Sequence, residues 1–90
     1  MRSPLSLGRV VATPGTLRLL EVVGDHPFEL LARHAAGDWG DLCAFDRCQN
    51  EIALRDGYRV LSSYAVGRER VWIITEADCS ITTILLPEEY

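Results

Sequence analysis

Side chains that could perform acid–base chemistry lie close together in the middle of the chain. His34 is followed by Asp38 and Asp41, a spacing that would let a carboxylate orient the imidazole as a general base. The rest of a hydrolase is missing from the pattern, because no Ser or Cys lies in a nucleophile elbow and no glycine-rich phosphate loop follows a predicted strand. We therefore predict no catalytic residue, and we keep a small hydrolase or nuclease-like enzyme that uses His34 as the alternative.

A metal site could be built from the same region. Its ligands would be His34, Cys43, Cys48 and Asp46. Structural zinc sites use two ligand pairs with only a few residues between the members of each pair. Here Cys43 and Cys48 form one loose pair, and Cys79 is isolated. The sequence predicts no metal and no cofactor, and it predicts cysteines that are reduced and buried as small apolar side chains.

A structural corner is the interpretation we favour for the central block. Gly37 and Gly40 free the backbone for positive φ, and the Asp41 carboxylate can accept hydrogen bonds from the first N–H groups of the next helix. A histidine at the end of a helix usually binds the last carbonyl groups of that helix. The expected corner consists of His34, Asp38, Trp39 and Asp41, with Trp39 as a buried packing residue.

Three helices are expected around this corner, at about 14–23, 27–37 and 42–56. Each begins beside capping or proline residues, and each ends at a glycine. In the third helix, apolar residues recur at helical spacing and are expected to face the core. This apolar set consists of Leu42, Phe45, Cys48 and Ile52.

A period of two replaces the helical period from residue 58. It predicts strands at 58–66, 70–76 and 81–86, and residues 8–12 can add a fourth strand at an edge. We therefore predict one α+β domain over residues 1–90 with the order β-α-α-α-β-β-β. Three short helices would pack on one face of a three- to four-stranded antiparallel sheet.

The predicted sheet is apolar on both faces, whereas three helices can cover only one of them. We expect the other face to bind a protein partner or to form a homodimer, with Tyr58, Tyr64 and Trp72 in the contact. The alternative is that loops or the N-terminal segment cover this face.

The formal net charge of −4 is concentrated in residues 25–56, which hold seven acidic residues and three arginines. An acidic surface opposes binding to phosphate. We therefore keep a helix-turn-helix DNA-binding regulator only as an alternative. The same surface suits a basic protein target, with Glu29, Asp46 and Glu51 as the expected contact residues. Because no apolar stretch is long enough for a signal peptide or a membrane span, we expect a cytoplasmic protein that does not bind a membrane.

Several motifs of the chain resemble one known family. They are LARHAAGDWGDL at 31–42, RVLSSY at 59–64, WIITEAD at 72–78 and TTILLPEEY at 82–90, together with Asn50. These motifs are similar to those of short uncharacterised "plasmid-related" proteins of bacterial plasmids, prophages and integrated elements. That family has no established activity, so the resemblance implies no catalytic residue. It implies a mobile genetic element and, by association, an anti-CRISPR or anti-restriction inhibitor that docks on a nuclease or CRISPR complex.

Overall fold

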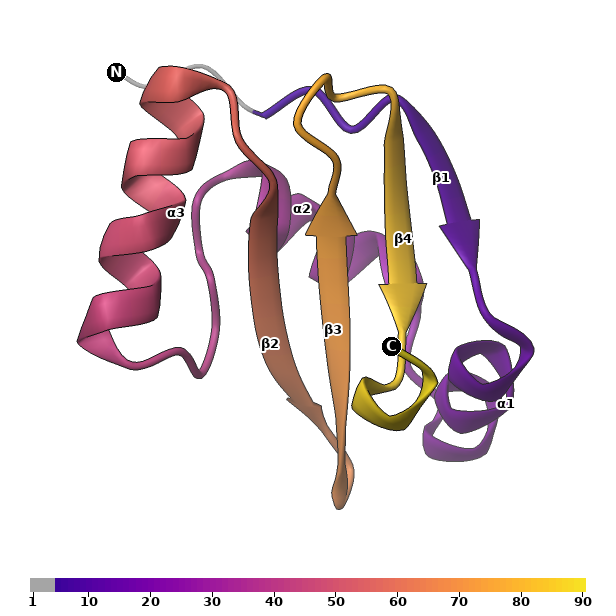
Figure 1. The fold of residues 1–90 in the computed structure, drawn as a ribbon. Coiled ribbons are helices and arrows are strands. Elements are labelled where there is room, and N and C mark those ends of the chain that lie inside the picture. The colour runs from indigo at the N-terminus through magenta and orange to yellow at the C-terminus, as the bar shows by residue number, and fades with distance from the viewer. Residues whose placement is uncertain (1–4) are drawn as a thin grey trace.

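The computed structural model describes residues 5–90 and has the α+β architecture and element order that the sequence predicts (Figure 1). The elements are β1 (Arg9–Ala12), α1 (Pro14–Val23), α2 (Pro27–Ala35), α3 (Ala44–Asp56), β2 (Val60–Val66), β3 (Glu69–Thr75), β4 (Ile81–Leu85) and a short 3-10 turn, η1 (Pro87–Glu89). Of the predicted domain, residues 1–4 lie outside the described part.

The four strands form one mixed sheet in the order β1-β4-β3-β2. The β2, β3 and β4 strands make the expected antiparallel meander, and β1 lies at an edge as predicted. However, β1 runs parallel to β4, with Val10 opposite Thr82, so the prediction of a purely antiparallel sheet is wrong. The sequence pattern does not predict whether β1 runs parallel or antiparallel to β4, because the two strands are joined through three helices and a hairpin rather than by a tight turn.

Local end signals account for the helix bounds. The Thr13 Oγ1 atom accepts a hydrogen bond from the Thr16 N–H (3.2 Å) at the start of α1, and Gly24 ends that helix with a φ of 83°. At the start of α2, the His26 ring accepts from the Phe28 N–H (3.2 Å). The starts of α1 and α2 and the stop of α1 are as predicted. The α2 helix ends earlier than predicted, at Ala35, and its C-cap residue is Ala36 rather than Gly37.

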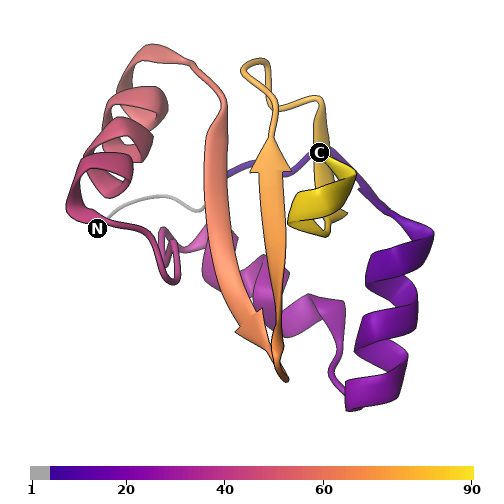
Figure 2. The same ribbon diagram turned by 60° about the horizontal axis from the view of Figure 1, so that its bottom comes forward.

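The main core lies between one face of the sheet and the first two helices. Leu20 of α1 and Leu30 and Leu31 of α2 pack on strand residues of that face, and α2 runs behind the sheet in Figure 1. A second, smaller core joins Trp39, Ala53 and Val60. It places α3 beside β2, as Figures 1 and 2 both show, so α3 does not share the layer of α1 and α2 that the sequence predicted.

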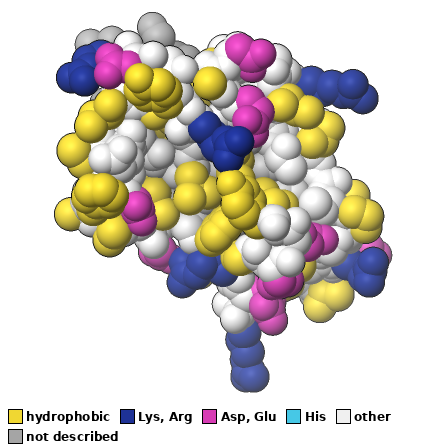
Figure 3. Space-filling view, in the orientation of Figure 1, with side chains coloured by type: hydrophobic (Ala, Val, Ile, Leu, Met, Phe, Trp, Pro, Cys, Tyr) yellow, Lys and Arg dark blue, Asp and Glu magenta, His cyan; other side chains and the backbone are white. Residues whose placement is uncertain are grey.

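The opposite face of the sheet is partly covered by the C-terminal segment. The Tyr90 ring packs edge-on against Trp72, with the ring centroids 5.7 Å apart, and its hydroxyl accepts a hydrogen bond from Arg59 (2.8 Å). Ile74 and Leu85, which share this face with Trp72, are buried. This face is turned to the viewer in Figure 3, where apolar side chains are mixed with charged ones. It is therefore less apolar and less open than the strand pattern suggests.

Candidate functional site

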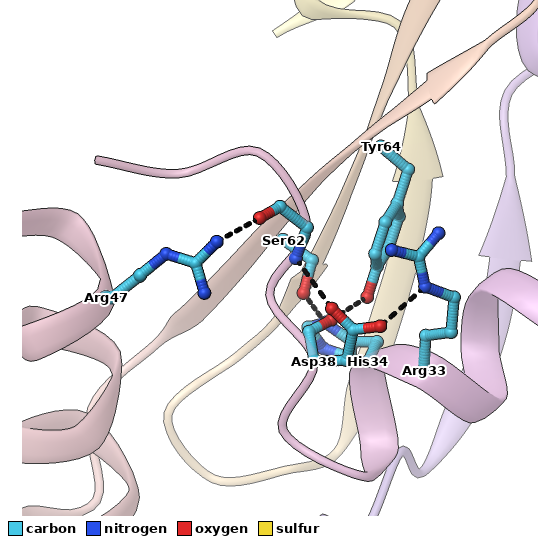
Figure 4. A network of polar contacts seen from close by, with 7 residues as sticks. Arg33, His34, Asp38, Arg47, Ser62 and Tyr64 are labelled. Atoms are coloured by element: carbon cyan, nitrogen blue, oxygen red, sulfur yellow. Dashed lines mark hydrogen bonds and ion pairs between the residues drawn. The ribbon is translucent and has the colours of Figure 1, made fainter. Parts of the chain in front are cut away.

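His34, the candidate base, lies inside the main core. Its side chain is 0% exposed, with Nδ1 2.6 Å from the Ser62 hydroxyl and Nε2 2.9 Å from the Thr75 hydroxyl. Figure 4 shows the ring at the end of α2, pointing to β2. The ring therefore links α2 to two strands, and the prediction that it binds the last carbonyls of its own helix is wrong.

A chain of hydroxyl groups fixes the tautomer of His34. The Thr82 hydroxyl donates to the Leu7 carbonyl (2.7 Å), so it can only accept from the Thr75 hydroxyl (2.7 Å). Thr75 has then used its proton and accepts from Nε2–H of His34, and Nδ1 accepts from Ser62. Every bond in this chain is made with a neutral ring.

Burial lowers the pKa of His34 to about 4, so the ring is neutral at pH 7. A neutral imidazole beside a serine hydroxyl has the composition of a base and a nucleophile. However, Ser62 is also 0% exposed. In this conformation both groups are closed to solvent, and the contacts of His34 join α2 to β2 and β3.

Asp38 and the residues after it form a loop that is held against β2. The Asp38 carboxylate accepts from Arg33 Nε (2.7 Å) and the Gly40 N–H (3.2 Å), and the Arg33 guanidinium holds the pKa of Asp38 below its usual value. The Asp38 carbonyl accepts from the Tyr64 hydroxyl (2.5 Å), while the Arg33 guanidinium lies 4.5 Å from the centre of the Tyr64 ring. These contacts are visible in Figure 4.

The next residues add a short strand-like bridge to β2. The Asp41 N–H donates to the Ser63 carbonyl (2.7 Å), and the Ser63 N–H donates to the Trp39 carbonyl (3.1 Å). Gly40, between them, has a φ of 73°, and a Cβ atom there would lie 2.1 Å from the Ser63 carbonyl oxygen. Only glycine fits this position, because both the backbone conformation and the space exclude a side chain.

The prediction that Asp41 caps α3 is wrong. The N-cap residue is Cys43, which makes no side-chain capping bond, and the Asp41 carboxylate pairs instead with Arg70 (3.1 Å). The bridge to β2 holds Asp41 away from the first turn of the helix. Trp39 is buried as predicted, at 2% exposure, and its Nε1–H donates to Glu51 (3.0 Å).

Asn50, which the sequence analysis assigned no role beyond its place in the resemblance, attaches α3 to the sheet. Its side-chain amide donates to the Leu61 carbonyl (2.6 Å) and accepts from the Leu61 N–H (3.0 Å). It therefore pairs with β2 as a neighbouring strand would. A polar residue on the side of the helix that carries Ala53 was the available signal, since buried amides must find partners.

The apolar side of α3 faces away from the protein. Phe45 is 69% exposed and Cys48 is exposed, so the prediction that they face the core is wrong. Ile52 is half-buried. Leu42, which lies before the first residue of α3, packs against the smaller core as predicted. Phe45 and Cys48 are exposed because the pairing of Asn50 with β2 turns the opposite side of the helix inward. We call Phe45, Cys48 and Ile52 the α3 stripe. In Figure 3, yellow side chains lie over the part of the molecule where Figure 1 draws α3.

The remaining predicted residues are scattered. Tyr64 is 1% exposed, so its place in a partner-binding surface is wrong. Tyr58 is 63% exposed, and Trp72 is half-buried against Tyr90. Glu29, Asp46 and Glu51 are all exposed, although Asp46 accepts from the Cys43 thiol and Glu51 from Trp39. The predicted burial of the cysteines is wrong for Cys43 and Cys48, which are exposed, and Cys79 is partly exposed.

Within residues 5–90, no three His, Cys, Asp or Glu side chains come close enough together to hold a metal ion. In the same residues, no helix is both long and apolar enough to cross a membrane. A pocket of about 60 Å³ lies between the end of α3 and the turn before β4, with Tyr58, Glu76 and Cys79 in its lining. It has room for little more than a small side chain.

No protein-family model, curated protein or solved structure matches this chain in comparisons with known proteins. Fold and contacts together define a class, which is a small α+β domain with a mixed four-stranded sheet and a helix packed beside its β2 edge.

Proposed function

We propose that this chain is a non-enzymatic protein-binding module and that the α3 stripe is its contact surface. The observation that carries the proposal is the orientation of α3, which turns Phe45 and Cys48 to solvent. A large apolar residue such as Phe45 gains stability only when it leaves water, and the fold does not bury it. Exposed apolar side chains grouped on one side of a helix are typical of surfaces that bind another protein.

The placement of the polar residues supports a binding role over the hydrolase alternative. Within residues 5–90, the imidazole that contacts a serine hydroxyl is that of His34, and both of its ring nitrogens are hydrogen-bonded inside the core. The surface around α3 carries Asp46 and Asp56 as well as arginines that are already occupied. Arg47 binds the carbonyls of Gly40 and Leu42, and Arg55 pairs with Asp56. Such a surface also argues against the DNA-binding alternative.

The resemblance to plasmid-related proteins extends this proposal to a target. We propose a host-defence protein, a nuclease or a CRISPR complex, with a basic surface that complements the exposed carboxylates of Glu29 and Asp46. The module would act inside the cell by docking on this target.

Capture with matched variants tests the binding role. The tagged chain is expressed together with an untagged copy in the organism that encodes it, and captured proteins are identified by mass spectrometry. We expect proteins that bind the wild type and are lost from the Phe45→Glu/Ile52→Glu variant. Phe28→Glu is the control, because Phe28 is 71% exposed on α2, much as Phe45 is on α3. An identical set of captured proteins for both variants would contradict the proposal.

A further inference from the structure

Residues 87–90 fold back over the second face of the sheet, and we call them the 87–90 strap. The Tyr90 ring packs edge-on against Trp72, and the Tyr90 hydroxyl accepts a hydrogen bond from Arg59. Tyr90 is 69% exposed and Trp72 is half-buried, so the strap covers the indole from outside. A surface segment of this kind opens more readily than a core strand, because it buries little apolar surface.

Glu89 attaches the strap to α1. Its carboxylate accepts hydrogen bonds from the Thr13 hydroxyl (2.6 Å) and from the Leu86 N–H (2.8 Å). A Cβ atom at Gly15 would lie 2.7 Å from Glu89 Oε2, so the carboxylate lies against the first turn of α1. Figures 1 and 2 both show η1 beside this helix. The strap is therefore bound to a residue, Thr13, that lies 76 positions earlier in the sequence.

The negative charge of Glu89 is favourable in this place. The first turn of α1 contains no acidic residue, although the helix dipole favours a carboxylate there. The hydrogen bond from Thr13 is the largest of the causes that hold the pKa of Glu89 below its usual value, and the Arg18 guanidinium is a smaller one. The ionised side chain is thus more stable when the strap is closed, and the closed strap is more stable when the side chain is ionised.

We infer that the 87–90 strap is a cover that can open and that Glu89 is its latch. While the Glu89 carboxylate lies on α1, Tyr90 shields the Trp72 indole, and loss of the latch exposes it. The strap itself thereby occupies the sheet face on which the sequence pattern predicted a partner contact at Trp72, and it controls access to that face. This inference does not depend on the α3 stripe, so either can fail without the other.

Quenching of tryptophan fluorescence by acrylamide tests the latch, because acrylamide reaches exposed indoles more often than covered ones. Glu89→Ala removes the carboxylate, whereas Gly15→Ala keeps it and places a methyl group where it lies. Tyr90→Ala removes the cover itself. We expect the quenching of Trp72 to rise about twofold in all three variants. Glu88→Ala is the matched control, since Glu88 is the adjacent exposed carboxylate, and it should be quenched as the wild type is.

The same variants in a Trp72→Phe background separate strap opening from general loosening. Trp39 is then the fluorescent tryptophan, and its 2% exposure should keep quenching low and equal in every variant. Quenching that still rises in this background would overturn the inference. Wild-type quenching in Glu89→Ala together with a rise in Tyr90→Ala would also overturn it, because the cover would then stay closed without its latch. An unchanged Tyr90→Ala variant would show that the strap does not shield Trp72.

Discussion

At the scale of single residues, the two histidines occupy opposite environments. His26 caps α2 from the surface, whereas His34 is enclosed, and its burial keeps the ring neutral. The residue types around His34 are those of an active site, but their burial makes them part of the core. Residue type and spacing alone cannot distinguish these roles, because burial is a property of the packed molecule.

The lowered pKa of His34 predicts a pH-dependent stability. The unfolded chain binds a proton at this ring near pH 6.5 and the folded chain only near pH 4, so the free energy of unfolding should fall as the pH drops from 6.5 to 4. The full loss is about 3 kcal/mol. Asp38, whose pKa is lowered from 3.8, contributes only below this range. Urea unfolding at several pH values measures the slope.

A pair of variants assigns that slope to one residue. His34→Gln should remove it, whereas Gln49→Ala should keep it because Gln49 is exposed and does not titrate. A slope that survives in a folded His34→Gln variant would show that another group titrates in this range.

Two glycines that both have a positive φ give a matched comparison. Gly40 and Gly57 have φ values of 73° and 80°, but an added Cβ would clash with the Ser63 carbonyl only at Gly40. Gly57→Ala should therefore cost about 1–2 kcal/mol, the strain of a left-handed residue. Gly40→Ala should cost at least ~2 kcal/mol more, because the bridge to β2 must shift. Equal midpoints in urea would contradict the close packing of the loop on β2.

At the scale of elements, local chemistry made most bounds predictable. Thr13 with Pro14 and the glycines after α1 and α3 act within a few residues, so their effect is visible in the sequence. The facing of α3 and the direction of β1 were not predictable in this way. Both depend on contacts between distant residues, in one case a single amide, Asn50, that binds the main chain of β2.

Asn50 is therefore expected to matter more for α3 than its apolar stripe does. Asn50→Ala would leave the Leu61 N–H and carbonyl without their partner and should cost about 2–4 kcal/mol in free energy of unfolding. The neighbouring Gln49 is exposed, so Gln49→Ala should change stability by less than ~0.5 kcal/mol. Chemical denaturation of both variants checks this difference, which would be absent if α3 were held by apolar contacts alone.

At the scale of the whole molecule, net charge separates the two kinds of partner. Two copies that each carry −4 repel one another, whereas an acidic module and a basic target attract. The double variant Glu29→Arg/Asp46→Arg brings the formal net charge to zero and changes two exposed side chains. It leaves Glu51, which binds Trp39, in place.

We expect this double variant to bind a basic target more weakly than the wild type at low salt, and equally well at high salt, where charges are screened. Titration with a captured protein at about 50 and 500 mM NaCl measures this difference. Equal binding of both chains at low salt would show that Glu29 and Asp46 lie outside the contact.

The contacts along the outer edge of β2 affect how copies of this chain can aggregate. Edge-to-edge growth into a fibre needs two free edges on each molecule, one for the copy before and one for the copy after. The main-chain groups of Leu61 and Ser63 along the outer edge of β2 are already bound by Asn50 and by the loop at 39–41. A strand from another molecule would first have to displace both Asn50 and this loop. Sheet extension at this part of β2 is therefore opposed, which makes the folded chain a poorer seed for amyloid than a sheet with two open edges.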